Sequence, residues 1–189
     1  LGSSVERVRP ELGIDGRISS HFSYRLHGGY LLKDNAVMDV IVEDGSGYRP
    51  GVGYGRYQQA YAGAEWTMDF EAFRWDAAFM YAHTWDLPGL AGAWFVRPAA
   101  FKAETSAVYN WNKRVYVGVD CEFASIAKTI KSEVYLPYYV DLGAYAEYAF
   151  NKKLSVWLRG GNLLDMEIQR NPLFAEKGIN FTAGISLTF

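Results

Sequence analysis

The chain has 189 residues, of which 21% are charged, and its formal net charge is −2. This balance gives no electrostatic reason to expect a nucleic-acid partner, and the chain is too hydrophobic to be disordered. The single cysteine, Cys121, excludes a disulfide framework and a cysteine-rich metal site. No run approaches the ~18 apolar residues of a membrane-spanning helix. Aromatic residues make up 16% of the chain, with 14 Tyr and 19 Gly, which favours an all-β protein and a membrane barrel in particular.

Apolar and polar residues alternate along most of the chain, which is the pattern of strands that differ in environment on their two faces. The segment 115–123 shows the pattern clearly, because valines occupy one face while Asp120 and Glu122 lie on the other. The alternation predicts nine antiparallel strands, at 7–19, 22–33, 56–69, 74–86, 98–109, 114–125, 138–150, 154–162 and 178–189.

The predicted connections alternate in length along the chain. Short connections lie at 20–21, 70–73, 110–113 and 151–153, and long ones lie at 34–55, 87–97, 126–137 and 163–177. Short turns at one end and long loops at the other are typical of a bacterial outer-membrane barrel. A soluble β-sandwich or a lipocalin-like barrel also alternates, with its apolar residues facing inward, and it is the alternative interpretation.

Two features favour the transmembrane β-barrel. The polar faces carry charges of both signs, which can pair across strands in a wet lumen. Tryptophan and tyrosine gather at strand ends, as an interfacial girdle requires; these are Tyr57, Trp66, Trp75, Trp85, Tyr109, Trp111, Tyr138 and Tyr139. The predicted lumen network consists of Asp120, Glu122, Asp141, Glu147 and Arg159. The predicted lipid-facing residues include Val117, Val119, Leu142, Ala144, Ile185 and Leu187.

The last predicted strand alternates without a break to the C-terminal aromatic residue. It resembles the signal read by the outer-membrane barrel-assembly machinery, in which a polar residue and a glycine precede alternating apolar residues. Thr182, Gly184, Leu187 and Phe189 match that signal. A terminal strand with a flexible glycine can add to the edge of another sheet.

The preceding segment resembles the end of TonB-dependent outer-membrane transporters. In that family a penultimate strand runs into an Asn-Leu-aromatic-Asp turn, and here the turn reads Asn162-Leu163-Leu164-Asp165, with Leu164 in place of the aromatic residue. The resemblance implies a barrel of 22 strands around an N-terminal plug, with nutrient uptake (a metal chelate, a vitamin or a glycan) powered through TonB. The partners that follow are outer-membrane lipid, the barrel-assembly machinery, the rest of the barrel and plug, TonB, or a surface lipoprotein.

Strand parity bears on completeness. A single-chain barrel of the outer membrane has an even number of strands and both ends in the periplasm. Nine strands therefore predict that residues 1–189 are a single β-barrel region without a plug domain, namely the C-terminal 9–10 strands of a larger barrel. If residues 34–35 form a tight turn, the segment 36–43 becomes a tenth strand and a small self-contained barrel can close. Such a barrel, acting as a channel, an adhesin or a structural protein, is the alternative function.

The sequence offers little for catalysis. His21, His27 and His83 have no metal-ligand spacing, and we expect neither a metal nor a cofactor. Serines flank two of these histidines, so a lipid hydrolase is a third and weaker possibility, and we expect no enzyme. Ligand contacts are expected in the long loops, where aromatic residues and arginines suit anionic or sugar-like ligands; the candidates are Tyr48, Arg49, Tyr54, Trp94 and Arg97.

Overall fold

The computed structural model describes residues 5–85, 93–129 and 135–188, and these form strands joined by turns and loops. The strands are β1 (Val5–Val8), β2 (Glu11–Ser19), β3 (Phe22–Asp44), β4 (Gly47–Asp69), β5 (Phe73–Thr84), β6 (Ala93–Phe95), β7 (Phe101–Trp111), β8 (Val115–Ala124), β9 (Ala127–Lys128), β10 (Tyr135–Leu136), β11 (Tyr139–Ala149), β12 (Leu154–Gly161) and β13 (Asn180–Leu187). The all-β antiparallel class predicted from the sequence is confirmed. Within the described ranges, no helix is long and apolar enough to cross a bilayer.

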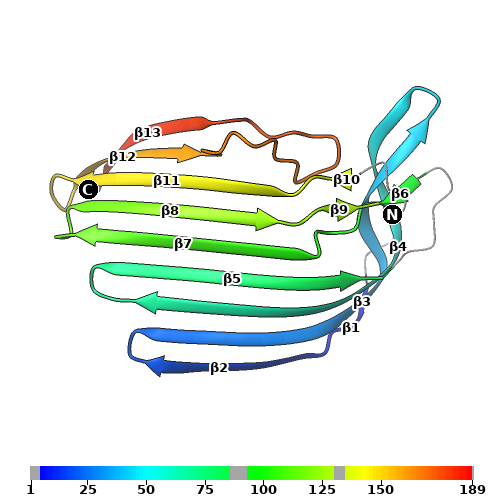
Figure 1. The fold of residues 1–189 in the computed structure, drawn as a ribbon, viewed down its shortest axis with the longest axis horizontal. Helices are drawn as coiled ribbons and strands as arrows, with labels where there is room; N and C mark the ends of the chain where they lie inside the picture. Colours follow the sequence, from blue (N-terminus) through cyan, green and yellow to red (C-terminus); the bar gives the residue numbers. More distant parts are fainter. Residues whose placement is uncertain (1–4, 86–92, 130–134, 189) are drawn as a thin grey trace.

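One large antiparallel sheet contains all strands except β9 and β10 (Figure 1). Its strand order is β1-β3-β4-β5-β7-β8-β11-β12-β13, and β2 also pairs with β3. β1 and β2 share one edge of β3, because β2 pairs with residues 22–29 and β1 with residues 32–34. Pro10 separates them, since it has no N–H to donate, although its carbonyl accepts the Tyr30 N–H at 3.0 Å. If β1 and β2 are counted as one interrupted strand, the described sheet is nine strands wide, as the alternation predicts.

The prediction of a long loop at 34–55 is wrong. β3 and β4 continue through this segment, and their pairing runs from Ala36 opposite Gly55 to Asp44 opposite Gly47. The alternative of a tenth strand after a tight turn is wrong as well, because residues 36–43 extend β3. Asn35, at φ 52°, lies in a bulge where the register shifts, and the strand goes on beyond it.

The extended β3–β4 hairpin carries two of the three small apolar clusters found among the described residues. β6 pairs with residues 40–42 of β3. Ile41, Val96 and Ala127 form one cluster, and Ala36, Met38 and Phe95 form another. Elsewhere the sheet is a single layer with many exposed apolar side chains, such as Leu12 at 85% and Ile185 at 67%. A single layer with an exposed apolar face is the architecture of a barrel wall in lipid.

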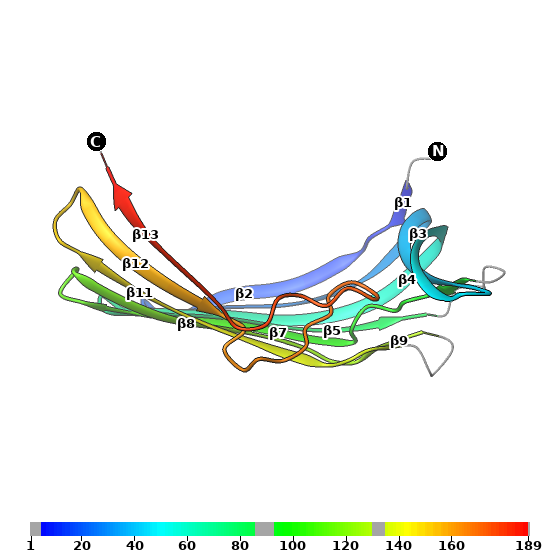
Figure 2. The same cartoon turned by 90° about the horizontal axis from the view of Figure 1, so that it is seen from above.

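The sheet is curved, and it is open in the described part of the chain (Figure 2). The short turns lie at one end together with the C-terminus, and the long connections lie at the other end (Figure 1). Each strand of the sheet runs antiparallel to its neighbour. From β2 to β13 the direction reverses an even number of times, so these two edge strands run in the same direction. The described residues contain no hydrogen-bonded pairing between β2 and β13.

Candidate functional site

Strand register gathers carboxylates on one face of the sheet. Glu104 of β7 lies opposite Glu122 of β8, which in turn lies opposite Asp141 of β11. A hollow of about 570 Å³ lies along these strands. Ala78 of β5 also lines it, with a side chain that is too small to fill it. The charged residues that line the hollow are Glu65, Asp76, Glu104, Asp120, Glu122, Asp141, Arg159 and Arg170. We call this face of the sheet the polar face.

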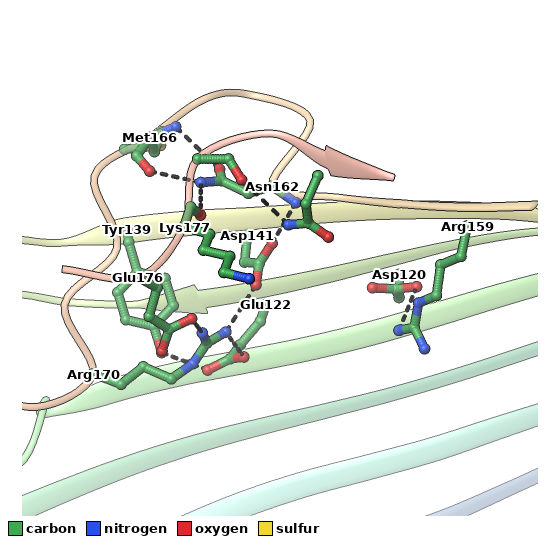
Figure 3. A network of polar contacts seen from close by, with 12 residues as sticks. Asp120, Glu122, Tyr139, Asp141, Arg159, Asn162, Met166, Arg170, Glu176 and Lys177 are labelled. Atoms are coloured by element: carbon green, nitrogen blue, oxygen red, sulfur yellow. Dashed lines mark hydrogen bonds and ion pairs between the residues drawn. The ribbon is translucent and has the colours of Figure 1, made fainter. Parts of the chain in front are cut away.

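The structure brings four of the five predicted lumen residues into ion pairs (Figure 3). Asp120 and Arg159 approach to 3.6 Å across strands. Glu122 and Asp141 share a partner that the sequence does not single out, Arg170 in the loop between β12 and β13. Glu147 lies apart from the network, near the short turns.

Arg170 is the centre of the network. One guanidinium nitrogen, Nη2, donates to Glu122 at 2.6 Å and to Asp141 at 2.9 Å, while Nη1 donates to Glu176 of the same loop. The side chain is 31% exposed, so solvent screens these contacts only in part. The hydrogen bond to Glu122 raises the pKa of the Arg170 guanidinium above its ordinary value, and this group is charged at any physiological pH.

Tyr139 differs from the girdle position that the sequence predicts. It is 5% exposed, and its hydroxyl donates to Glu122. The Arg170 guanidinium carbon lies 5.1 Å from the centre of the tyrosine ring, which is a cation–π distance. Ile168, at 1% exposed, packs with Tyr139 and Ala124. The loop is therefore held on the polar face by an apolar anchor as well as by charge.

Asn162 ties the two ends of this loop together. Its side-chain Nδ2 donates to the carbonyls of Met166 (2.8 Å) and Lys177 (3.3 Å), and its Oδ1 accepts the Met166 N–H at 3.1 Å. Asp165 closes the loop by accepting the Ile179 N–H at 3.3 Å. Both residues have positive φ, which Asn and Asp tolerate best among non-glycine residues. The Asn162–Asp165 turn marks the loop in the sequence, but no pattern there indicates Arg170.

The five predicted loop residues do not form one site. Tyr48 and Trp94 make an edge-on aromatic contact with ring centres 6.0 Å apart. Arg49 pairs with Asp44 at 3.1 Å near the hairpin tip, and Tyr54 lies further along β4 and is 42% exposed. Arg97 lines a separate cavity of about 270 Å³. That cavity also contacts Asp39, Lys102, Glu122, Tyr139 and Arg170, so it adjoins the Arg170 network.

The residues of the predicted assembly signal lie on β13, except Phe189, which lies outside the described residues. Thr182 lies opposite Arg159, and Leu187 lies opposite Leu154. Gly184 lies opposite Trp157, and a Cβ atom at position 184 would come within 2.5 Å of the indole. A side chain at this position would therefore require the Trp157 indole to shift, apart from any role of Gly184 in assembly.

The histidines have local partners. His21 Nδ1 lies 2.8 Å from the Asp69 carbonyl and its ring stacks on Phe70. His27 Nδ1 lies 3.8 Å from Glu65. Within residues 5–85, no hydrogen bond joins a histidine ring to a serine hydroxyl. Across the three described ranges, no group of three His, Cys, Asp or Glu side chains is placed to hold a metal ion.

The curved antiparallel sheet, with one apolar and one polar face, has the architecture of part of a β-barrel wall. Copper transporter OprC matches it with a TM-score of 0.71 and 11% identity, over 95% of this chain and 31% of that one. The siderophore receptor PirA of Acinetobacter baumannii matches with a TM-score of 0.71 and 14% identity, over 98% of this chain and 32% of that one. A mutant of the ferric enterobactin receptor PfeA of Pseudomonas aeruginosa matches with a TM-score of 0.70 and 15% identity, over 98% and 31%.

These structural neighbours are TonB-dependent receptors of the bacterial outer membrane, so the predicted resemblance is confirmed at the level of fold. The chain spans about a third of the length of the neighbours. No family model matches the sequence, and no curated protein matches it.

Proposed function

We propose that residues 1–189 form part of the wall of an outer-membrane transporter that takes up a nutrient such as a metal chelate, a vitamin or a glycan. The observation that carries this proposal is the match of nearly the whole chain to about a third of known receptor and transporter barrels. In this proposal, residues 1–189 supply part of the barrel wall. The plug, the contact with TonB and most of the substrate site are supplied by other parts of the transporter. The polar face lines the lumen, and the long connections face the cell exterior.

The strand directions argue against a small self-contained barrel. β2 and β13 run in the same direction, so direct closure needs a parallel pair, whereas bacterial single-chain barrels are antiparallel throughout. Open edges in lipid would leave backbone groups unpaired at several kcal/mol each. We therefore infer that further strands complete the barrel, from the same polypeptide or from another chain.

Disulfide trapping tests this closure. With Cys121 replaced by serine, cysteines are introduced in the full chain at Leu12 and Phe181, which lie near the starts of β2 and β13, and oxidation is followed in outer membranes. We expect no cross-link within one chain. Efficient cross-linking would favour the small closed barrel, acting as a channel, an adhesin or a structural protein.

The proposed placement of the two faces is tested by charge insertion. Val119 is 46% exposed on the apolar face, and Ser106 lies on the polar face opposite Asp120. Arginine at a mid-membrane lipid-facing position costs roughly 2–4 kcal/mol, and a lumen position tolerates it far better. We expect Val119→Arg to reduce the heat-modifiable folded band strongly and Ser106→Arg to leave it nearly unchanged. Equal loss in both variants would overturn the proposed orientation of the faces.

The barrel-assembly machinery is the proposed partner during insertion. Deletion of Phe189 should reduce insertion more than deletion of an apolar residue from an internal strand. For Gly184 the comparison is with Gly118, where a Cβ atom would also clash, at 2.0 Å from the Tyr145 ring. If packing alone decides, alanine at either position reduces insertion equally. If Gly184 is also read as a signal, the loss is larger at Gly184.

Uptake itself is tested in cells with a panel of ferric siderophores, copper, cobalamin and oligosaccharides. We expect accumulation of one member to require this protein and to stop when an uncoupler removes the inner-membrane energy that TonB transmits. Energy-independent leakage of many small solutes, with an open conductance in planar bilayers, would instead favour a channel.

A further inference from the structure

Two hollows of opposite charge lie along the polar face. At the short-turn end, a hollow of about 720 Å³ lies between the β7–β8 turn and the β11–β12 turn. Its charged lining residues, with an excess of three positive charges, are Lys113, Arg114, Lys152, Lys153 and Glu147. The hollow of about 570 Å³ described above is lined by six carboxylates and two arginines, an excess of four negative charges. We call the first the rim hollow and the second the central hollow, and residues 112–114 and 151–153 are the short-turn rim.

Strand spacing shows that both hollows open on the same side of the sheet. Tyr116 of the rim hollow and Asp120 of the central hollow are four positions apart along β8. Ser155 and Arg159 have the same relation along β12. Because side chains alternate between the two faces of a strand, residues an even number of positions apart share a face. The rim hollow therefore opens toward the proposed lumen.

Backbone and side-chain hydrogen bonds fix both turns of the rim. Asn110 Oδ1 accepts the Lys113 N–H, and Asn151 Oδ1 accepts the Lys153 N–H, each at 2.8 Å. The turns are joined to each other, because the Ala149 N–H of the β11 end donates to the Arg114 carbonyl at 2.7 Å. The rim cations therefore project from a fixed support.

The rim cations have little internal neutralisation. Lys113 lies 3.9 Å from Glu71, and both side chains are largely exposed. Among the residues that the structure describes, Arg114, Lys152 and Lys153 have no ion-pair partner. A cluster of like charge at fixed positions is unfavourable by itself and gains free energy from an anion.

Ser155 provides a second observation that points to a ligand in the rim hollow. It lines this hollow from β12 and is only 8% exposed. Its hydroxyl has no hydrogen-bond partner within the described part of the chain. A buried hydroxyl without a partner is unfavourable, and a carboxylate that accepts its hydrogen would remove this cost.

We propose that an acidic segment of polypeptide, supplied by another part of the transporter, binds the short-turn rim and presents basic side chains to the central hollow. The inference rests on the proposed function, which places the polar face in the lumen. Asp120 follows Arg114 by six positions, which is about 20 Å along an extended chain. A polypeptide with acidic and basic residues at that separation matches both hollows. A polymer of uniform negative charge, such as a nucleic acid, matches the rim hollow and is repelled by the central one.

Photo-cross-linking of the full protein in outer membranes tests the two hollows separately. The photoreactive residue p-benzoylphenylalanine replaces Tyr116 in the rim hollow or, in a second protein, Ser106 in the central hollow. Mass spectrometry then identifies captured peptides from outside residues 1–189. We expect capture of a segment rich in Asp and Glu at position 116 and of one rich in Lys and Arg at position 106.

Charge variants test whether the rim cations hold the acidic segment. Lys152→Gln with Lys153→Gln should lower capture at position 116 by roughly threefold. The matched control, Lys128→Gln with Lys177→Gln, removes the same charge from the long connections and should leave this capture near wild type. If the test variant does not fold, Lys152→Arg with Lys153→Arg should retain capture, and high salt should weaken it.

Two kinds of result would overturn the inference. One is capture of a neutral or basic segment, or of no polypeptide, at position 116, and the other is an equal loss in the two charge variants. The proposed membrane placement is checked separately with p-benzoylphenylalanine at Val119 on the apolar face. Capture of lipid there supports that placement whether or not the rim binds a peptide, and capture of polypeptide counts against it.

Discussion

Two long segments, residues 36–55 and residues 162–179, extend from the long-connection end of the sheet, and different interactions hold each of them in place. We call these two segments the excursions. The β3–β4 hairpin extends the sheet with a regular backbone ladder from residue 36 to residue 55, and β6 adds apolar packing at its base. The loop of residues 162–179 contains no strand of the large sheet and lies against the polar face. It is held by a few side chains, chiefly Asn162, Ile168 and Arg170.

The difference shows where each excursion is vulnerable. A ladder distributes its stability over many backbone hydrogen bonds, so most side chains of the hairpin can change at little cost, except those in the apolar clusters. A loop held by side chains concentrates its stability at its anchors. Substitutions should therefore act locally, each within its own excursion, and the expected effects below run from the largest to the smallest.

The largest expected effect is Ile41→Ala in the hairpin. Ile41 is 2% exposed and packs with Val96 and Ala127, so truncation leaves a cavity that costs about 4 kcal/mol of local stability. Hydrogen exchange of residues 36–43 should accelerate, while residues 162–179 keep their protection. Val52→Ala in the same hairpin is the control, since Val52 is 59% exposed. Faster exchange in both excursions would show that they are coupled.

The next effect is Asn162→Ala in the loop. The change removes three side-chain hydrogen bonds from a residue that is 3% exposed and places alanine at φ 47°. Together these cost about 3 kcal/mol, and protease should then cut within residues 163–177. Asn112→Ala is the matched control at φ 51°, where the conformational cost is about 1 kcal/mol. Equal protease sensitivity at both sites would contradict the role of Asn162 as an anchor.

Arg170→Leu should cost somewhat less, about 2 kcal/mol, because the ion pairs it breaks are only partly buried. The variant leaves Glu122 and Asp141 side by side without a counter-charge, so the loop should detach from the polar face. Arg49→Leu is the control, because the Arg49–Asp44 contact, at 3.1 Å, is also an arginine–carboxylate pair but its arginine side chain is 66% exposed. Distances between spin labels on the loop and on β8 would report the detachment. An unchanged distance in Arg170→Leu would leave Ile168 as the main anchor.

The sequence predicts the sheet far better than it predicts the loops. Alternation with period two shows which residues share a face of the sheet, so it is sufficient to predict the strands at 22–33 and 114–125. The same alternation continues through 36–43, but Asn35 and the glycines of residues 51–55 suggest a loop. The hairpin is stabilised by a tertiary contact that the local sequence does not show. β6, which is distant in sequence, pairs with residues 40–42, and Val40 and Ile41 are buried there.

The sequence does not predict Arg170, the centre of the ion-pair network, for a related reason. The carboxylates Glu122 and Asp141 are visible as polar positions on strands, and the register of β8 against β11 makes them neighbours. Arg170 stands in a segment without periodicity, so nothing local indicates that it returns to the sheet. The prediction that Tyr139 belongs to the girdle is wrong. A tyrosine at a strand end fits either face of the sheet, and only the hydrogen bond to Glu122 places Tyr139 on the polar face.

The smallest expected effect concerns pH at the hairpin tip, outside the proposed membrane span. The Ser46 hydroxyl and the Ser46 N–H, which donates at 3.0 Å, both bond to the Asp44 carboxylate, and with Arg49 nearby they hold the Asp44 pKa below its ordinary value of 3.8. A carboxyl whose pKa is lowered by folding stabilises the fold above its unfolded pKa, and that contribution is lost as the pH falls through the folded value. The tip should therefore stay ordered at pH 4 and above and loosen only below about pH 3.8, with the Ser46 amide resonance following the change. Ser46→Ala removes the hydroxyl, so its midpoint should move up toward 3.8. Coincident midpoints in the two proteins would mean that the ladder alone holds the tip, and the contrast with the side-chain-held loop would then be complete.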